Sequence, residues 1–184
     1  MKRVLLIAIA CFGCTIASAQ VCQAPTLAAI EPTVETKGWV PVRVTNLMRI
    51  GVPGPIQRMG FDAQGFGAMF SGGRKLALMF DDGALARRHN GVTDKAGPLM
   101  SGMYSGTTSD RCRLLQTAGL ERFDYRVRFV QGTLAVYAYG SGTAYKFTAV
   151  HANKPDTVIQ GLAEGFDRSA FLDLMSTIQP PEQE

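Results

Sequence analysis

The sequence predicts an α+β protein: an antiparallel sheet of hairpins and a meander, covered by a C-terminal helix and one or two shorter helices. Three observations lead to this prediction. Residues 125–151 contain three strand-like runs separated by short turns, residues 66–80 contain another hairpin, and residues 168–178 carry one helical apolar stripe. Short turns join antiparallel neighbours, whereas parallel strands need long crossovers. The last helix is therefore expected to pack its stripe on one face of the sheet.

The meander gives the clearest strand signal. In its first run, residues 125–130, Tyr125, Val127 and Phe129 alternate with Arg126 and Arg128, which indicates a half-buried strand. The second and third runs, residues 133–139 and 144–151, follow turns with glycine at 132, 140 and 142.

The N-terminal half predicts further strands. Residues 66–70 and 75–80 flank a turn with two glycines, and the second of these runs is apolar on both faces, so we place it centrally in the sheet. Residues 39–45 alternate and contain Pro41, which favours an edge strand. Residues 47–50 are expected to extend that strand.

The last helix is predicted from its cap and its stripe. Asp167 suits the N-cap, and Phe171, Leu174, Met175 and Ile178 follow the spacing i, i+3, i+4, i+7. We interpret this stripe as core. Shorter helices are predicted at residues 84–90, at 109–118 and from the turn 153–156 through Leu162, whereas residues 98–104 fit a short strand or a buried loop.

The N-terminus resembles a secretory signal. Lys2 and Arg3 precede an apolar run at residues 4–16, and Ala17-Ser18-Ala19 fits a cleavage site. We therefore expect a signal peptide at 1–19, an arm at 20–38, one domain at 39–179 and a tail at 180–184, in a periplasmic or secreted protein. A membrane helix would need about 20 residues, so none is expected in the mature chain. A lipoprotein using Cys11 or Cys14 is the second interpretation.

Charge and cysteine content agree with an exported domain. The formal charge of +4 falls to +2 once Lys2 and Arg3 leave with the signal, which gives no reason to expect nucleic-acid binding. Cys22 and Cys112 then remain as an even pair in an oxidising compartment, and we predict a disulfide between them. A reactive thiol or a metal-binding pair is the alternative.

Few residues suit catalysis or metal binding. The chain has only two histidines, His89 and His151, and adjacent Asp81 and Asp82 fit a turn better than a shared site. No Gly-x-Ser-x-Gly motif is present, and no Gly-x-Gly precedes a helix in the way that phosphate binding requires. No metal or cofactor is expected.

The charged face of the meander is the candidate binding surface. Arg126 and Arg128 share one side, and neighbouring strands add Tyr137, Tyr139 and Lys146. Arginine and tyrosine are enriched in protein interfaces. The prediction holds if no helix covers this face; a solvated sheet face is the alternative.

The order of elements resembles that of the MOG1/PsbP-like fold of small exported bacterial proteins. Hairpins come first, a three-strand meander follows, and a helix of the form Phe171-x-x-Leu174-Met175-x-x-Ile178 closes the chain. The resemblance covers residues 39–179 by element order only, and the glycine-rich residues 91–106 depart from it. It implies a sheet with helices on both sides and binding rather than catalysis.

We therefore expect an exported, non-catalytic binding protein of the cell envelope with a protein partner, such as an immunity or inhibitor protein. One alternative is a periplasmic hydrolase that uses His89 or His151 with Asp81 or Asp82. A second alternative is an envelope assembly or structural factor.

Overall fold

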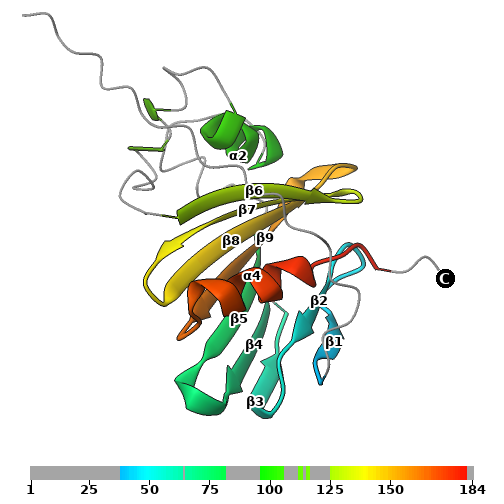
Figure 1. Cartoon of the computed structure of the whole chain (residues 1–184). Coiled ribbons are helices and arrows are strands. Elements are labelled where there is room, and N and C mark those ends of the chain that lie inside the picture. The colour runs from blue at the N-terminus through cyan, green and yellow to red at the C-terminus, as the bar shows by residue number, and fades with distance from the viewer. Residues whose placement is uncertain are drawn as a thin grey trace, which may run out of the picture.

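The computed structural model describes residues 38–63, 65–81, 96–105, 112–113, 115–116 and 125–181. The predicted signal peptide, the arm up to residue 37, the predicted helix at 84–90, and Cys22, Asp82 and His89 lie outside this part of the chain. Most of the described chain is sheet, with one helix near the C-terminus (Figure 1). The α+β prediction is correct at this level.

Seven antiparallel strands form the main sheet, in the order β3-β4-β5-β9-β8-β7-β6. Their bounds are β3 (Ile56–Phe61), β4 (Gly65–Phe70), β5 (Lys75–Asp81), β6 (Tyr125–Gln131), β7 (Leu134–Ser141), β8 (Ala144–His151) and β9 (Lys154–Glu164), with a 3₁₀ turn η1 (Ser71–Gly73) between β4 and β5. The predicted meander and the predicted central strand are confirmed. The sheet thus consists of two meanders, β3 to β5 and β6 to β9, which join where β5 pairs with β9.

One face of this sheet is covered by helix α4 (Arg168–Ser176) and by the hairpin of β1 (Val40–Arg43) and β2 (Arg49–Val52) (Figure 1). Asp167 caps α4 as predicted, because its Oδ1 accepts from the N–H of Ala170 at 2.8 Å. The four predicted stripe residues are fully buried in the main core.

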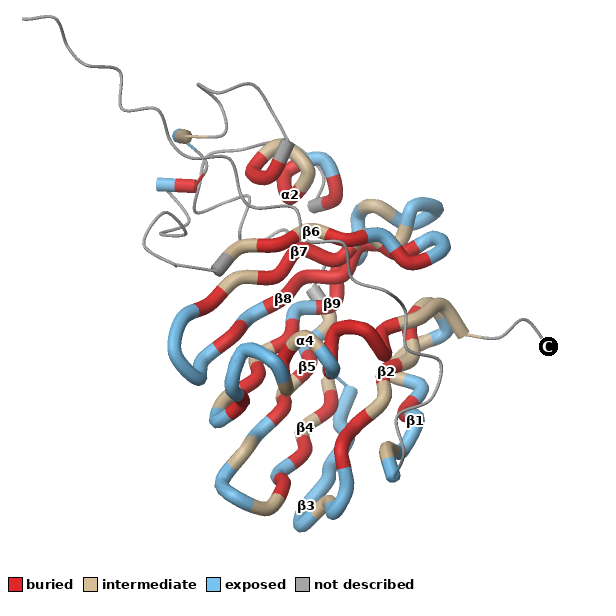
Figure 2. The backbone as a smooth tube through the Cα atoms, viewed as in Figure 1, coloured by how far each residue is buried: buried red, intermediate tan, exposed pale blue. Residues whose placement is uncertain are grey.

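Helix α2 (Ala96–Ser105) lies on the opposite face, over β8 and β9. Its apolar side chains form a second, smaller core that is separate from the first among the described residues. Figure 2 shows buried positions both on α2 and on the strands beside it. The buried members are Leu99, Met100, Met103, Tyr104, Leu115, Tyr137, Val150 and Val158. The sheet therefore has a helix on each side.

Three predicted elements were wrong. Residues 98–104 belong to α2 rather than to a strand or loop, because Leu99, Met100, Met103 and Tyr104 bury one helical face. Residues 154–164 form β9 rather than a helix, because this segment pairs with β5 and β8 along both of its edges. Residues 49–52 return as β2, antiparallel to β1, instead of extending it.

Candidate functional site

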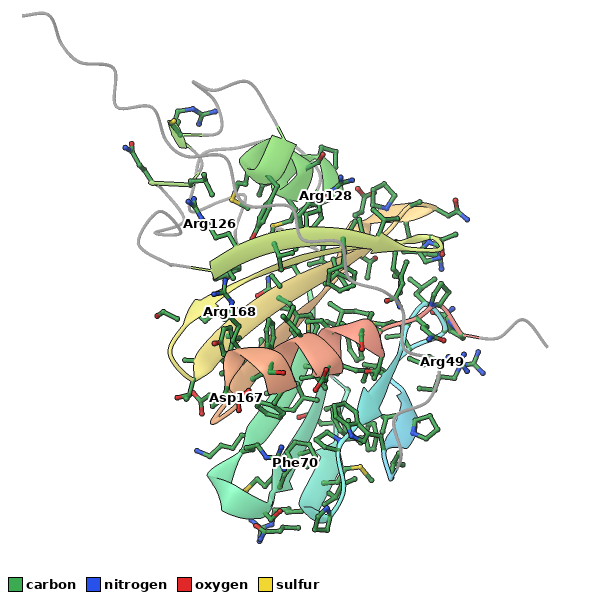
Figure 3. All side chains as sticks on the ribbon, in the orientation of Figure 1. Arg49, Phe70, Arg126, Arg128, Asp167 and Arg168 are labelled. Atoms are coloured by element: carbon green, nitrogen blue, oxygen red, sulfur yellow. The ribbon has the colours of Figure 1, made fainter. Side chains whose placement is uncertain are left out.

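The strand register brings all five predicted binding residues to one face of the meander. Arg126 lies opposite Tyr139, which lies opposite Lys146, and Arg128 lies opposite Tyr137 in the adjacent row. Residues directly opposite each other in a sheet point to the same side. This is the side that carries α2, and Figure 3 shows both arginine side chains between β6 and that helix.

Helix α2 removes Tyr137 from the predicted binding surface. The Tyr137 side chain is only 3% exposed, and its ring lies 5.0 Å from that of Tyr104, whose hydroxyl donates to the carbonyl of Ala138 at 3.2 Å. The prediction required that no helix cover this face. For Tyr137 that condition fails. This residue is buried under α2, where its ring contacts Tyr104 and the Arg128 guanidinium.

Arg126 and Arg128 are half-buried and retain unused hydrogen-bond donors. Nη1 of Arg126 and Nε of Arg128 are inaccessible to solvent, and neither has a hydrogen-bond partner in the described chain. The Arg128 guanidinium lies 5.8 Å from the centre of the Tyr137 ring, a cation–π contact. A buried donor without a partner costs about 1–3 kcal/mol, and more if it is charged. These two groups therefore reduce the stability of the protein while it is unbound.

Tyr139 and Lys146 extend the row away from the sheet edge. Tyr139 is half-buried, and its burial raises the pKa of the phenol above the ordinary value of 10.0, so the side chain stays neutral near pH 7. Lys146 is exposed. We define Arg126, Arg128, Tyr139 and Lys146 as the basic face. Its three cations form no ion pair within the part of the chain described here.

The described histidine is engaged in local hydrogen bonds. Nδ1 of His151 accepts the N–H of Asn153 at 3.1 Å, so in the neutral ring Nε2 carries the proton and donates to Oγ1 of Thr133 at 2.8 Å. The backbone of Asp81 pairs with Val158, which belongs to the α2 side. His151 lies opposite Leu134 of the α4 side. The side chain of Asp81, like His89 and Asp82, lies outside the part of the chain that the structure describes.

Metal binding has no support among the residues that the structure describes, where no three His, Cys, Asp or Glu side chains gather. Cys112 is disulfide-bonded. Its predicted partner, Cys22, lies outside the described chain, so the pairing stays a prediction. Leu115, close to Cys112 in sequence, is fully buried in the α2 core.

One further site was missed in the sequence. A pocket of about 170 Å³ lies between the β1–β2 turn and the main sheet. The lining residues are Thr45, Asn46, Leu47, Phe80, Leu134, Ala149, His151, Lys154, Thr157 and Ile159. The sequence of its β9 residues favours a helix, so no sequence signal places them beside Phe80 and Ala149.

No protein-family model, curated protein or solved structure matches this chain. The resemblance to MOG1/PsbP-like proteins therefore remains an inference from the order of elements. Within the described ranges, neither helix has the length and apolar character needed to span a bilayer.

Proposed function

We propose that this protein is an exported, non-catalytic binding protein of the cell envelope, and that its basic face receives carboxylates of a protein partner. The observation that supports this proposal is the pair of arginines on β6, whose buried N–H groups have no partner in the described chain. Carboxylate oxygens would satisfy these donors, and charge-assisted hydrogen bonds of this kind are stronger than neutral ones.

The position of the two arginines suits recognition. They project from the same side of one strand, and β7 pairs with that strand along its whole length. Side chains held by regular elements are positioned more accurately than side chains on loops, so less conformational entropy is lost on binding. An immunity or inhibitor protein that covers acidic groups of an enzyme is one form of this function, and an envelope assembly factor would use the same surface.

Nothing in the described geometry favours the hydrolase alternative. Both ring nitrogens of His151 already form hydrogen bonds, with Thr133 and Asn153. A general base must reach the proton that it removes and must be oriented by a third group. His151 has neither a free nitrogen nor an adjacent carboxylate among the described residues.

Capture from envelope extracts tests the proposal. Three baits would be compared by quantitative mass spectrometry: the wild type, Arg126→Gln/Arg128→Gln, and the control Arg43→Gln/Arg58→Gln, which removes the same charge from exposed positions. We expect a partner that is retained by the wild type and the control and is reduced about tenfold or more by the first double variant, since 1.4 kcal/mol corresponds to tenfold.

The captured partner is then purified and titrated at increasing salt. Binding should weaken with ionic strength, because exposed charges are screened. The Arg126→Gln/Arg128→Gln variant should be at least as stable as the wild type, since the removed donors have no partner in the unbound protein. A partner retained equally by all three baits, or no partner at all, would contradict the proposal. Intact mass of the exported chain tests cleavage before Gln20.

A further inference from the structure

The pocket beside the β1–β2 turn lies on the opposite side of the sheet from the basic face. Its floor is a row across three strands, in which Phe80 of β5, Ile159 of β9 and Ala149 of β8 lie directly opposite one another. Leu134 of β7 and the ring of His151 close one end, and Leu47 of the hairpin turn contributes to the wall. Every residue of this lining belongs to the described chain.

Ala149 is the residue that leaves space in this floor. It is 2% exposed and lies between Val136 and Ile159 in the register, so the row is Phe80, Ile159, Ala149, Val136. Three of its members are large and one carries a single methyl group. A larger side chain at position 149 would occupy the hollow.

The size of the pocket limits its ligand. Its volume of about 170 Å³ is close to the roughly 150 Å³ of an engineered apolar cavity that binds benzene. It is far below the roughly 300–1,000 Å³ typical of sites for drug-sized ligands. One ring or one short branched chain would fill it, whereas a nucleotide would not.

The polar residues at the rim of the pocket favour a ligand with a negative charge. Lys154, Asn46 and Thr157 are all exposed and contribute polar groups. Lys154 forms no ion pair in the described part of the chain, and no Asp or Glu lines the pocket. A lysine ammonium stays in water while its aliphatic stem covers apolar surface. An anionic group at the rim would meet this cation while an apolar body lies over Ala149.

We propose that this pocket binds a small carboxylate with an apolar body about the size of benzene. The body occupies the hollow over Ala149, and the carboxylate is held at the rim by Nζ of Lys154 and by the hydroxyl of Thr157. This site is independent of the basic face, so either proposal can fail without the other.

Nuclear magnetic resonance titrations of the full exported chain test the site with three probes. Benzoate supplies the ring and the charge, benzyl alcohol supplies the ring alone, and acetate supplies the charge alone. We expect saturable amide shifts at Ala149, Lys154 and Ile159 with benzoate. The other two probes should bind with an affinity at least about tenfold weaker than that of benzoate. Equal affinity for benzoate and benzyl alcohol, or the absence of saturable shifts, would overturn the proposal.

Three variants locate the binding. Lys154→Gln should weaken benzoate binding about tenfold while leaving benzyl alcohol binding unchanged. Thr157→Trp should block the mouth from an exposed position, and Thr143→Trp is its control, in the exposed β7–β8 turn outside the lining. Ala149→Leu should abolish the shifts by filling the floor. If Ala149→Leu does not fold, Thr157→Trp decides the test by itself. Benzoate binding that persists in Thr157→Trp would contradict the assignment of the ligand to this pocket.

Discussion

Phe147 is buried because the residue opposite it has no side chain. It lies across from Gly161 in the β8–β9 register and is 1% exposed in the main core. A Cβ atom at position 161 would overlap the ring atoms Cε1 and Cζ of Phe147. A methyl group at position 161 would therefore need the space that the Phe147 ring occupies, and neither the strand backbone nor the buried ring can move away easily.

Gly161→Ala should lower the free energy of unfolding by about 1–3 kcal/mol, the usual cost of forcing extra carbon into a packed core. Urea denaturation measures this change. The matched control is Gly67→Ala: Gly67 also lies within a strand, but a Cβ there would meet nothing within 4 Å. That variant should stay within about 0.5 kcal/mol of the wild type.

Equal effects of the two substitutions would show that backbone entropy, and not the ring, decides the result. A second mutation separates these causes further. Phe147→Leu in the Gly161→Ala background should recover part of the loss, because the shorter side chain vacates the space beside the new methyl group. Coupling between adjacent residues of this kind is measured by a double-mutant cycle.

At the scale of single residues, the sequence predicts on which side of the sheet a strand residue lies, but it does not predict how exposed that side chain is. Alternation along residues 125–130 correctly assigned Arg126 and Arg128 to one side of the strand, since Val127 and Phe129 are buried on the other. The burial of Tyr137 could not be predicted in the same way. It depends on α2, a helix that the sequence did not reveal.

Two of the wrongly predicted elements, α2 and β9, show how packing overrides local preference. Helix α2 contains two glycines and a proline in AGPLMSGMYS, so its local helix propensity is poor. Most helical stability in proteins comes from tertiary packing, and α2 buries four large side chains against the sheet. In β9, Pro155 and Asp156 resemble the start of a helix, yet the next three residues are β-branched, and two of them, Val158 and Ile159, pair on both sides.

Helix α4 was predicted because its signals are local, but its attachment to β2 was not. Oγ1 of Thr177 accepts from the N–H of Gly51 at 3.0 Å and lies 2.7 Å from the carbonyl of Leu174, to which it donates. Beyond it, Arg49 and Gln179 pair through their backbones and their side chains. The end of α4 thereby fixes the small hairpin to the main body.

Thr177→Val should lower stability by about 1–3 kcal/mol, because the partly buried N–H of Gly51 loses its acceptor while the side-chain volume is kept. Thermal unfolding measures the loss, and Thr177→Ser, which retains the hydroxyl, should lie closer to the wild type. Hydrogen exchange at the amide of Gly51 gives a local readout and should become faster in the valine variant alone. Unchanged exchange would mean that this attachment contributes little.

At the scale of the whole molecule, the two faces of the sheet differ in how they are covered. Among the described residues, the α4 side carries a large continuous core, whereas the α2 side has a small cluster and carries the basic face beside it. Short turns allowed the hairpin of β4 and β5 and the meander from β6 to β8 to be predicted, but the pairing of β5 with β9 brings together segments about 80 residues apart. No local signal encodes such a contact. The pocket and the position of α2 both depend on it.

A disulfide at Cys112 would support the side of the sheet that carries α2. Cys112 is disulfide-bonded, and we predict Cys22 as its partner, which would close a loop of about 90 residues. Loss of a native disulfide typically costs about 2–5 kcal/mol. Cys112→Ser should therefore lower the free energy of unfolding by this amount, measured by urea denaturation of the exported protein without reductant.

The cysteine that pairs with Cys112 can be identified by testing whether the stability losses of single substitutions add. If Cys22 and Cys112 form one bond, Cys22→Ser, Cys112→Ser and the double variant should share the same stability within about 0.5 kcal/mol, because the second substitution removes nothing further. Dithiothreitol should bring the wild type to the same value and leave the variants unchanged. Additive losses, or a Cys22→Ser protein as stable as the wild type, would show that Cys112 pairs elsewhere.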